Sequence, residues 1–233
     1  MDELIFKIRK ELNKNIDGKY KKGAYRFFKE QIKLYGVRTP IARKIARENR
    51  IKDFKKIIQI SEIFLNSGYF EEGIIAFTMM GYFKGDFDKS TFDLFENWMD
   101  KYVHNWAWCD FLSTDLIAAC IENNPELVKD LFNWTDSKNR WKKRSAAVSL
   151  IPHGKKGRFL SEIFRTSVKL IPVRDDMVEK GVGWLLKEAS KAKQKEIIEF
   201  VQKHENEMTR ITFRYAIEKM PKNIRIRLMK KQV

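Results

Sequence analysis

Apolar residues recur every three or four positions along nearly the whole chain, a pattern typical of amphipathic helices. Short turn segments interrupt the pattern, and no Asn-Gly or Asp-Gly pair lies between alternating runs, so strands are not indicated. The pattern therefore predicts an all-α protein. The expected helices cover residues 2–15, 19–35, 39–50, 53–67, 69–83, 90–103, 105–123, 126–134, 138–151, 158–171, 175–191, 193–206 and 209–220.

Polar and special residues mark the expected helix ends. Thr39-Pro40 is expected to cap a helix and begin its first turn, and Ser90 is expected to cap another. Gly36 and Gly68 are expected to end the helices that precede them. A loop is expected at 152–157, and a basic tail after Pro221.

A weak repeat is visible in four apolar segments with small residues at the points of close approach. They begin at Gly73, Trp108, Arg144 and Gly181, roughly 36 residues apart. A period near 40 built from two helices is typical of HEAT or armadillo repeats. We therefore expect a single domain, 1–233, forming a right-handed α-solenoid of antiparallel helix pairs whose second helices line a concave face. A generic helical bundle with coincidental spacing is the alternative.

The charge balance favours a polyanionic partner. The chain has 47 Lys and Arg against 31 Asp and Glu, a net charge of +16. Nucleic acid or an anionic membrane would suit such a surface, whereas a lysine-rich solvated surface is the plainer explanation. No apolar stretch of about 18 residues exists, so no membrane span is expected. Without a signal-peptide pattern, and with Cys109 and Cys120 expected to be reduced packing residues, a cytoplasmic protein is expected.

Four residues form a candidate site if the repeats stack as expected. Trp106 and Asp110 lie one helical turn apart, and Arg144 and Trp184 fall in the second helices of the next two repeats. Indole faces attract cations, a carboxylate opposes positive charge, and Arg pairs with phosphate. The simpler alternative is that the tryptophans are core residues and that Asp110 only pairs with Arg144. Trp98, Trp108, Trp134 and Trp141 are assigned to packing.

Three longer segments strengthen the candidate site. NWAWCDFLSTDLI (105–117), NRWKKRSAAVSLI (139–151) and VEKGVGWLLKEASK (178–191), together with FFKEQIKLYGVRTP (27–40), resemble the AlkD-type DNA alkylation repair glycosylases. The likeness covers nearly the whole chain in order and spacing. The resemblance implies a solenoid of HEAT-like repeats that binds duplex DNA carrying purines alkylated at N3 or N7.

The resemblance also implies roles for individual residues. Trp106 and Trp184 match the family's pocket tryptophans, Asp110 matches the catalytic carboxylate, and Arg144 matches a motif arginine. The family's pocket Tyr is replaced here by Phe27, with Tyr25 two residues before it. The residues expected to contact DNA are Arg144, Lys142, Lys143, Phe27, Tyr25, Lys187, Arg210 and Arg214.

The expected function is therefore that of a DNA glycosylase in base excision repair, acting as a monomer with no metal and no cofactor. His104, His153 and His204 are scattered and form no ligand set. A cationic alkylpurine leaves as a neutral base, so a general acid is not required, and Asp110 would stabilise the sugar cation. Two alternatives stay open: a non-catalytic binder of damaged or branched DNA on the same scaffold, and a protein-binding HEAT solenoid.

Overall fold

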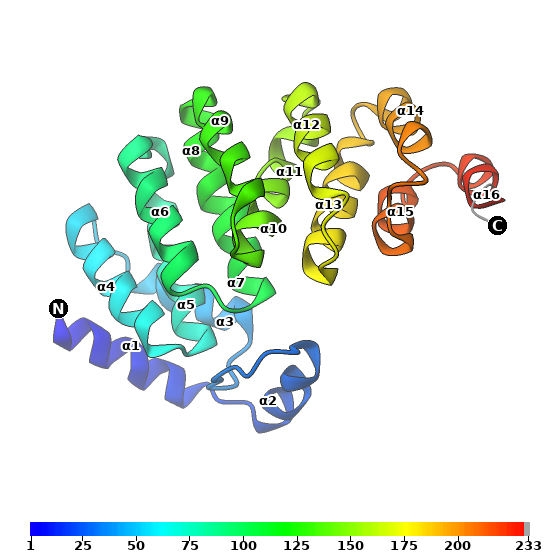
Figure 1. The fold of residues 1–233 in the computed structure, drawn as a ribbon. Helices are drawn as coiled ribbons and strands as arrows, with labels where there is room; N and C mark the ends of the chain where they lie inside the picture. Colours follow the sequence, from blue (N-terminus) through cyan, green and yellow to red (C-terminus); the bar gives the residue numbers. More distant parts are fainter. Residues whose placement is uncertain (231–233) are drawn as a thin grey trace. The chain divides into compact units, whose positions relative to one another are not determined.

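The computed structural model describes residues 1–230, and most of these residues are helical (Figure 1). Apart from one isolated bridge between Lys33 and Tyr69, the described residues contain no β-structure. The predicted all-α class is confirmed. The chain divides into two compact units, Met1–Leu112 and Ser113–Val233. The single domain expected from the sequence stays a prediction.

The first unit is built around α5 (Phe70–Met80). Every residue of α5 except Thr78 is buried, because the helix packs against α3, α4 and α7. Gly68 adopts a φ of 72° at the end of α4, and this left-handed residue lets the chain turn directly into α5. The other elements of the unit are α1 (Asp2–Lys14), α2 (Gly18–Ala24), η1 (Tyr25–Phe27), α3 (Thr39–Glu48), α4 (Phe54–Ser67), η2 (Gly81–Asp86), α6 (Lys89–Lys101) and α7 (Trp106–Phe111).

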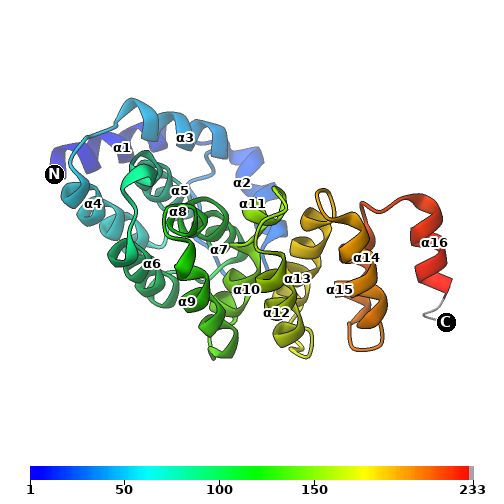
Figure 2. The ribbon, with the colours of Figure 1, turned by 90° about the horizontal axis from the view of Figure 1, so that it is seen from above.

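The second unit is built around α13 (Asp176–Ala189). This helix lies between α10 and α15, and the three run side by side (Figures 1 and 2). A π-helical turn, η3 (Leu112–Ile117), leads into the unit. The other elements are α8 (Ala118–Asn123), η4 (Pro125–Leu127), α9 (Val128–Asn133), η5 (Trp134–Asp136), α10 (Arg140–Val148), α11 (Ile151–Gly154), α12 (Leu160–Leu170), α14 (Gln194–Lys203), α15 (Arg210–Ile217) and α16 (Lys222–Lys230).

Glycines allow the second helices of neighbouring repeats to approach closely. A Cβ atom at Gly73 of α5 would lie 2.2 Å from the Trp108 ring on α7. A Cβ atom at Gly183 of α13 would lie 2.5 Å from the Cβ of Tyr215 on α15. Larger residues at these positions would separate the helices, as the small residues of the repeat pattern predicted.

Hydrogen bonds between neighbouring repeats have a regular spacing in the sequence. The partners are 31 to 38 residues apart, in agreement with the spacing of the four sequence segments. The bonds that define this range include Trp98 to Glu62, Trp108 to Phe70, His153 to Ala118, Thr212 to Glu179 and Lys187 to Glu218. Each unit is therefore an array of helical repeats linked mainly to their sequence neighbours.

The helix expected over 19–35 is wrong beyond residue 27. The structure has only α2 and η1 there, and residues 28–38 form an irregular segment. The reason is tertiary: the segment pairs with Tyr69 through Lys33 and donates backbone N–H groups to α5, and these bonds replace helical ones.

Smaller corrections concern helix ends. Asp88, not Ser90, caps α6, because its carboxylate accepts the N–H of Thr91. Thr39 is the first residue of α3 rather than its cap, a role that falls to Arg38. The expected loop at 152–157 begins with the short helix α11, and the described part of the basic tail forms α16.

Candidate functional site

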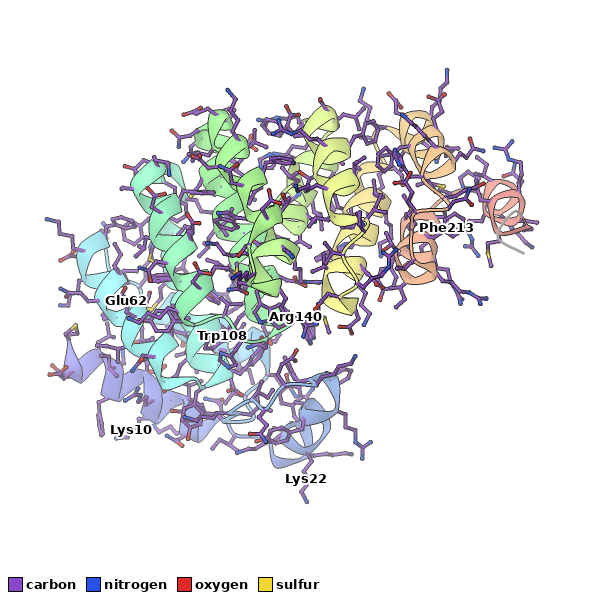
Figure 3. The ribbon with its side chains drawn as sticks, in the orientation of Figure 1. Lys10, Lys22, Glu62, Trp108, Arg140 and Phe213 are labelled. Carbon is purple, nitrogen blue, oxygen red and sulfur yellow. The ribbon has the colours of Figure 1, made fainter. Side chains whose placement is uncertain are left out.

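Trp108 fixes α7 on the core of the first unit (Figure 3). The Asn105 side chain caps the helix by accepting the N–H of Trp108 at 2.9 Å. The buried Trp108 indole packs over Gly73 and donates its N–H to the Phe70 carbonyl at 3.1 Å. Trp106 precedes Trp108 by two residues, so it points to another side of the helix and is only half-buried.

Trp106 is held by the segment that follows α2. Its indole N–H donates to the Phe27 carbonyl at 3.2 Å. The Phe28 ring stacks on it, with centroids 5.5 Å apart and planes 21° from parallel, and meets Phe70 edge-on at 5.4 Å. Asp110 follows one turn later on α7 and is half-buried. The first unit therefore places the Trp106 indole, against which Phe28 stacks, and the Asp110 carboxylate on the same short helix, α7.

Glu71 holds residues 35–37 of the irregular segment that follows Phe28. Its buried carboxylate accepts the backbone N–H groups of Tyr35, Gly36 and Val37 at 2.8 to 3.0 Å. Gly36 has a φ of 96°, a conformation that favours glycine. The residues that follow the Phe27–Phe28 pair are thereby fixed to the start of α5.

Glu72 provides a second anchor beside Glu71. It accepts two N–H groups from the Arg9 guanidinium, at 2.9 and 3.0 Å, and the Tyr35 hydroxyl at 2.7 Å. Burial, together with the hydrogen bond to Glu72, raises the pKa of the Tyr35 phenol. Tyr35 therefore stays neutral and donates its proton to the carboxylate, which ties α1 and the irregular segment to α5.

The aromatic residues of η1 occupy a different position from the one expected. The resemblance implies that Phe27 lies beside Trp106; its carbonyl accepts the indole N–H, but its ring is 75% exposed. The ring on Trp106 belongs to Phe28, which the sequence analysis did not single out. Tyr25 is 45% exposed. The adjacent Phe27–Phe28 pair was the one sequence signal for the second ring.

Arg144 is an internal residue of the second unit. Arg144 is 6% exposed, and its guanidinium donates to the Met177 carbonyl. The side chain lies against α13, since a Cβ atom added at Gly181 would be 3.3 Å from the Arg144 Cγ. Arg140, labelled in Figure 3, aligns the same two helices, since its guanidinium donates to Asp175 and Asp176 at 2.9 Å. Contact between Arg144 and a phosphate stays a prediction.

The other expected contacts of the second unit lie on α10, α13 and α15. Trp184 is half-buried on α13. Lys187 lies 3.2 Å from the Glu218 carboxylate and over the Tyr215 ring, while Lys142 lies over the Trp134 ring. Lys143 is half-buried, and Arg210 and Arg214 are exposed. The neighbouring second helices α13 and α15 thus carry Trp184, Lys187, Arg210 and Arg214. That these side chains form one site with Trp106 and Asp110 stays a prediction.

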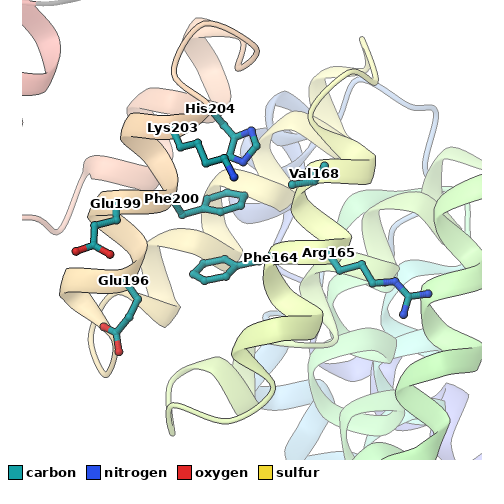
Figure 4. A pocket seen from close by; sticks show the side chains of 8 residues that line it. All are labelled: Phe164, Arg165, Val168, Glu196, Glu199, Phe200, Lys203 and His204. Atoms are coloured by element: carbon teal, nitrogen blue, oxygen red, sulfur yellow. The ribbon is translucent and has the colours of Figure 1, made fainter.

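A hollow of about 460 Å³ lies elsewhere in the second unit, between α12 and α14 (Figure 4). The Phe164 and Phe200 rings stack inside it, 4.5 Å apart and 3° from parallel. The helices α12 and α14 are the first helices of their repeats, and none of the expected site residues lines the hollow. It is therefore separate from the candidate site.

The four tryptophans and two cysteines predicted to be packing residues are buried. Trp98, Trp108, Trp134 and Trp141 are at most 6% exposed, and both cysteines are buried and unbridged. Across residues 1–230, no three His, Cys, Asp or Glu side chains gather in a way that could hold a metal ion. No helix in that range has the length and apolar character needed to cross a bilayer.

These features define an all-α protein built of helical repeats, with aromatic, acidic and basic side chains on their second helices. The model of the DNA alkylation repair enzyme family matches residues 8–220, and the chain belongs to that family. The protein therefore has a role in DNA repair.

A solved structure has the same fold. It is described as a predicted DNA alkylation repair enzyme from Enterococcus faecalis, is 14% identical, and superimposes with a TM-score of 0.79 over 89% of this chain and 98% of that one. At this identity the likeness shows the fold alone. A search of curated proteins found no significant match.

Proposed function

We propose that the protein is a DNA glycosylase that hydrolyses the N-glycosidic bond of purines alkylated at N3 or N7 in duplex DNA. The observation that supports this most is the arrangement on α7. There, Trp106 is fixed by the Phe27 carbonyl and the Phe28 ring, and Asp110 follows one turn later. A rigid aromatic face beside a carboxylate suits a cationic nucleoside.

The chemistry needs few groups from the protein. An alkylated purine carries a positive charge and leaves as a neutral base, so the bond between C1′ and the base nitrogen breaks without a general acid. Positive charge then moves to the sugar, where Asp110 stabilises it and aligns a water molecule. The water oxygen bonds to C1′, and its proton is released to solvent. Trp184 would provide a second aromatic face, and the exposed Arg210 and Arg214 would contact phosphates.

Substitution of Asp110 by Asn tests the mechanism. Because Asn is nearly isosteric but neutral, excision of 7-methylguanine should fall by about 100-fold or more, the scale for loss of one electrostatic stabiliser. The melting temperature and the affinity for duplex DNA should be nearly unchanged. Single-turnover base release from methylated duplex measures the effect. Asp93→Asn, at an exposed position on α6, is the matched control and should leave release unchanged.

Three outcomes contradict parts of the proposal. Undiminished release by folded Asp110→Asn protein removes the carboxylate from the mechanism. A wild-type protein that binds alkylated duplex but releases no base is instead a non-catalytic binder of damaged DNA. A variant that loses activity only in proportion to its loss of folded protein assigns Asp110 to structure.

A further inference from the structure

The hollow between α12 and α14 has an apolar floor that is open to solvent. Its floor is the stacked pair Phe164 and Phe200, of which Phe200 is buried and Phe164 is half-buried. Val168 lies beside them on α12 and is 42% exposed. The volume of about 460 Å³ is in the range of about 300–1,000 Å³ found for binding sites. Exposed apolar surface with a polar rim is typical of a site of interaction.

Charged side chains at the two ends of the hollow have opposite signs. Glu196 and Glu199 lie in the first half of α14, and Lys203 is its last residue (Figure 4). Glu199 and Lys203 are exposed, and neither forms an ion pair within residues 1–230. Glu196 and Lys203 are two helical turns apart, roughly 10 Å along the helix axis. A ligand that spans the hollow therefore needs a basic group at one end and an acidic group at the other.

We propose that this hollow binds an amphipathic helix of a partner protein, seated antiparallel to α14. The walls are helices whose backbone groups bond to each other, so the surface offers side chains and no sheet edge for an extended peptide. Apolar residues one turn apart on the partner would contact Phe164 and Val168. An acidic residue before them would face Lys203, and a basic residue after them would face Glu196 and Glu199. The helix dipole favours the same order, with acidic residues towards the N-terminus and basic residues towards the C-terminus.

The hollow and the expected DNA contacts lie in different layers of the second unit. The hollow lies between first helices, whereas Lys187, Arg210 and Arg214 lie on the second helices α13 and α15. A partner helix and DNA could therefore bind at the same time. The inference is independent of the proposed function, because it uses none of the residues of that site.

Peptide selection followed by binding measurements tests the inference. The probe is a phage-displayed library of randomised peptides of about 15 residues, long enough to form a helix. Peptides enriched on the wild-type protein should carry an acidic residue, apolar residues and a basic residue, in that order, over about two helical turns. Fluorescence anisotropy of the labelled peptide then gives its affinity for each variant.

Val168→Glu tests whether the enriched peptide lies in the hollow. It replaces an apolar contact with a charge that the peptide would bury, so binding should weaken by about tenfold or more. Ile226→Glu is the matched control, at an apolar side chain that is 46% exposed on α16, and it should leave the affinity unchanged. Because both side chains are exposed, both variants should keep the wild-type melting temperature.

A charge reversal tests the orientation of the partner helix. Glu199→Lys should weaken binding of the enriched peptide by about 2- to 5-fold, the scale of an exposed ion pair. A peptide whose basic residue is changed to Glu should bind Glu199→Lys protein more tightly than wild type. A purely structural role of Glu199 would not produce this reversal.

Several results would overturn the inference. These are no enrichment above a surface without protein, equal affinity of the enriched peptide for wild type and Val168→Glu, or a charge reversal that does not restore binding. Displacement of the peptide by saturating duplex DNA would also contradict it, because the peptide would then lie on the second helices. A protein that binds the peptide as expected but binds no DNA contradicts only the proposed function.

Discussion

Neighbouring aromatic residues in this protein occupy different environments, and the difference assigns their roles. Trp108 is fully buried and fastens α7 to α5, whereas Trp106, two residues earlier, is half-buried against Phe28. Phe28 likewise packs while Phe27 is exposed. The packing role of Trp108 could be predicted from the sequence, but the choice between Phe27 and Phe28 depends on a backbone turn after α2 that periodicity does not reveal.

His153 makes the free energy of unfolding depend on pH. The imidazole is 1% exposed, and its Nε2 lies 3.1 Å from the Ala118 carbonyl. Burial lowers the pKa of His153 from 6.5, although Glu122 acts in the opposite direction. The folded state therefore disfavours the charged ring. The stability linked to His153 is fully present above about pH 6.5 and is lost as the pH falls through the lower folded-state pKa.

Replacement of His153 by Gln tests this linkage. Gln can still donate to the Ala118 carbonyl but does not titrate, so the variant should lose less stability than wild type between pH 7 and pH 5. Urea unfolding at several pH values measures the difference. Comparison at pH 8, where the imidazole is neutral in both states, gives the cost of the substitution alone. Identical pH dependence in the two proteins would contradict the assignment.

At the scale of elements, glycine contacts between second helices should limit substitution. A Cβ at Gly183 would lie 2.8 Å from the Thr212 carbonyl oxygen, a backbone atom that cannot rotate away. Gly183→Ala should therefore lower the free energy of unfolding by about 1–3 kcal/mol, and the melting temperature by roughly 2–4 °C per kcal/mol. Thermal unfolding followed by circular dichroism measures the change.

Gly23→Ala is the matched control for this substitution. Gly23 lies in α2, and a Cβ there would have no neighbour within 4 Å. Alanine favours a helix over glycine by about 1 kcal/mol, so the melting temperature should stay the same or rise slightly. A Gly183→Ala protein with the wild-type melting temperature would mean that α13 and α15 can separate without cost.

Helices that are specified by their own residues could be predicted from the sequence, whereas a segment held by distant partners could not. The helix predicted at 175–191 corresponds to α13 at Asp176–Ala189, because its own apolar face and its Asp175 cap specify it. Residues 28–38 show similar apolar spacing but are not helical. Their backbone donors bind Glu71 of α5, and no local pattern could indicate a partner 34 to 36 residues away.

For the whole molecule, a net charge of +16 should make DNA binding sensitive to salt. Each phosphate contact releases counterions, so about five contacts give a log–log slope of affinity against salt near −4 to −5. Titration of labelled duplex at salt concentrations from about 50 to 200 mM measures this slope. Arg210→Ala and Arg214→Ala should each make the slope less steep by about 1. A slope near zero would favour a protein partner.

The spacing of the hydrogen bonds between repeats also affects how the chain is made. Because these bonds join positions 31 to 38 apart, each repeat needs mainly the repeat before it to form them. At a synthesis rate of about 5–20 residues per second, the partner of a new helix emerges within roughly 2 to 8 seconds. On the ribosome, the longest waits therefore fall in the first unit, where Arg9 meets Glu72 and Phe27 meets Trp106 only after 63 and 79 residues.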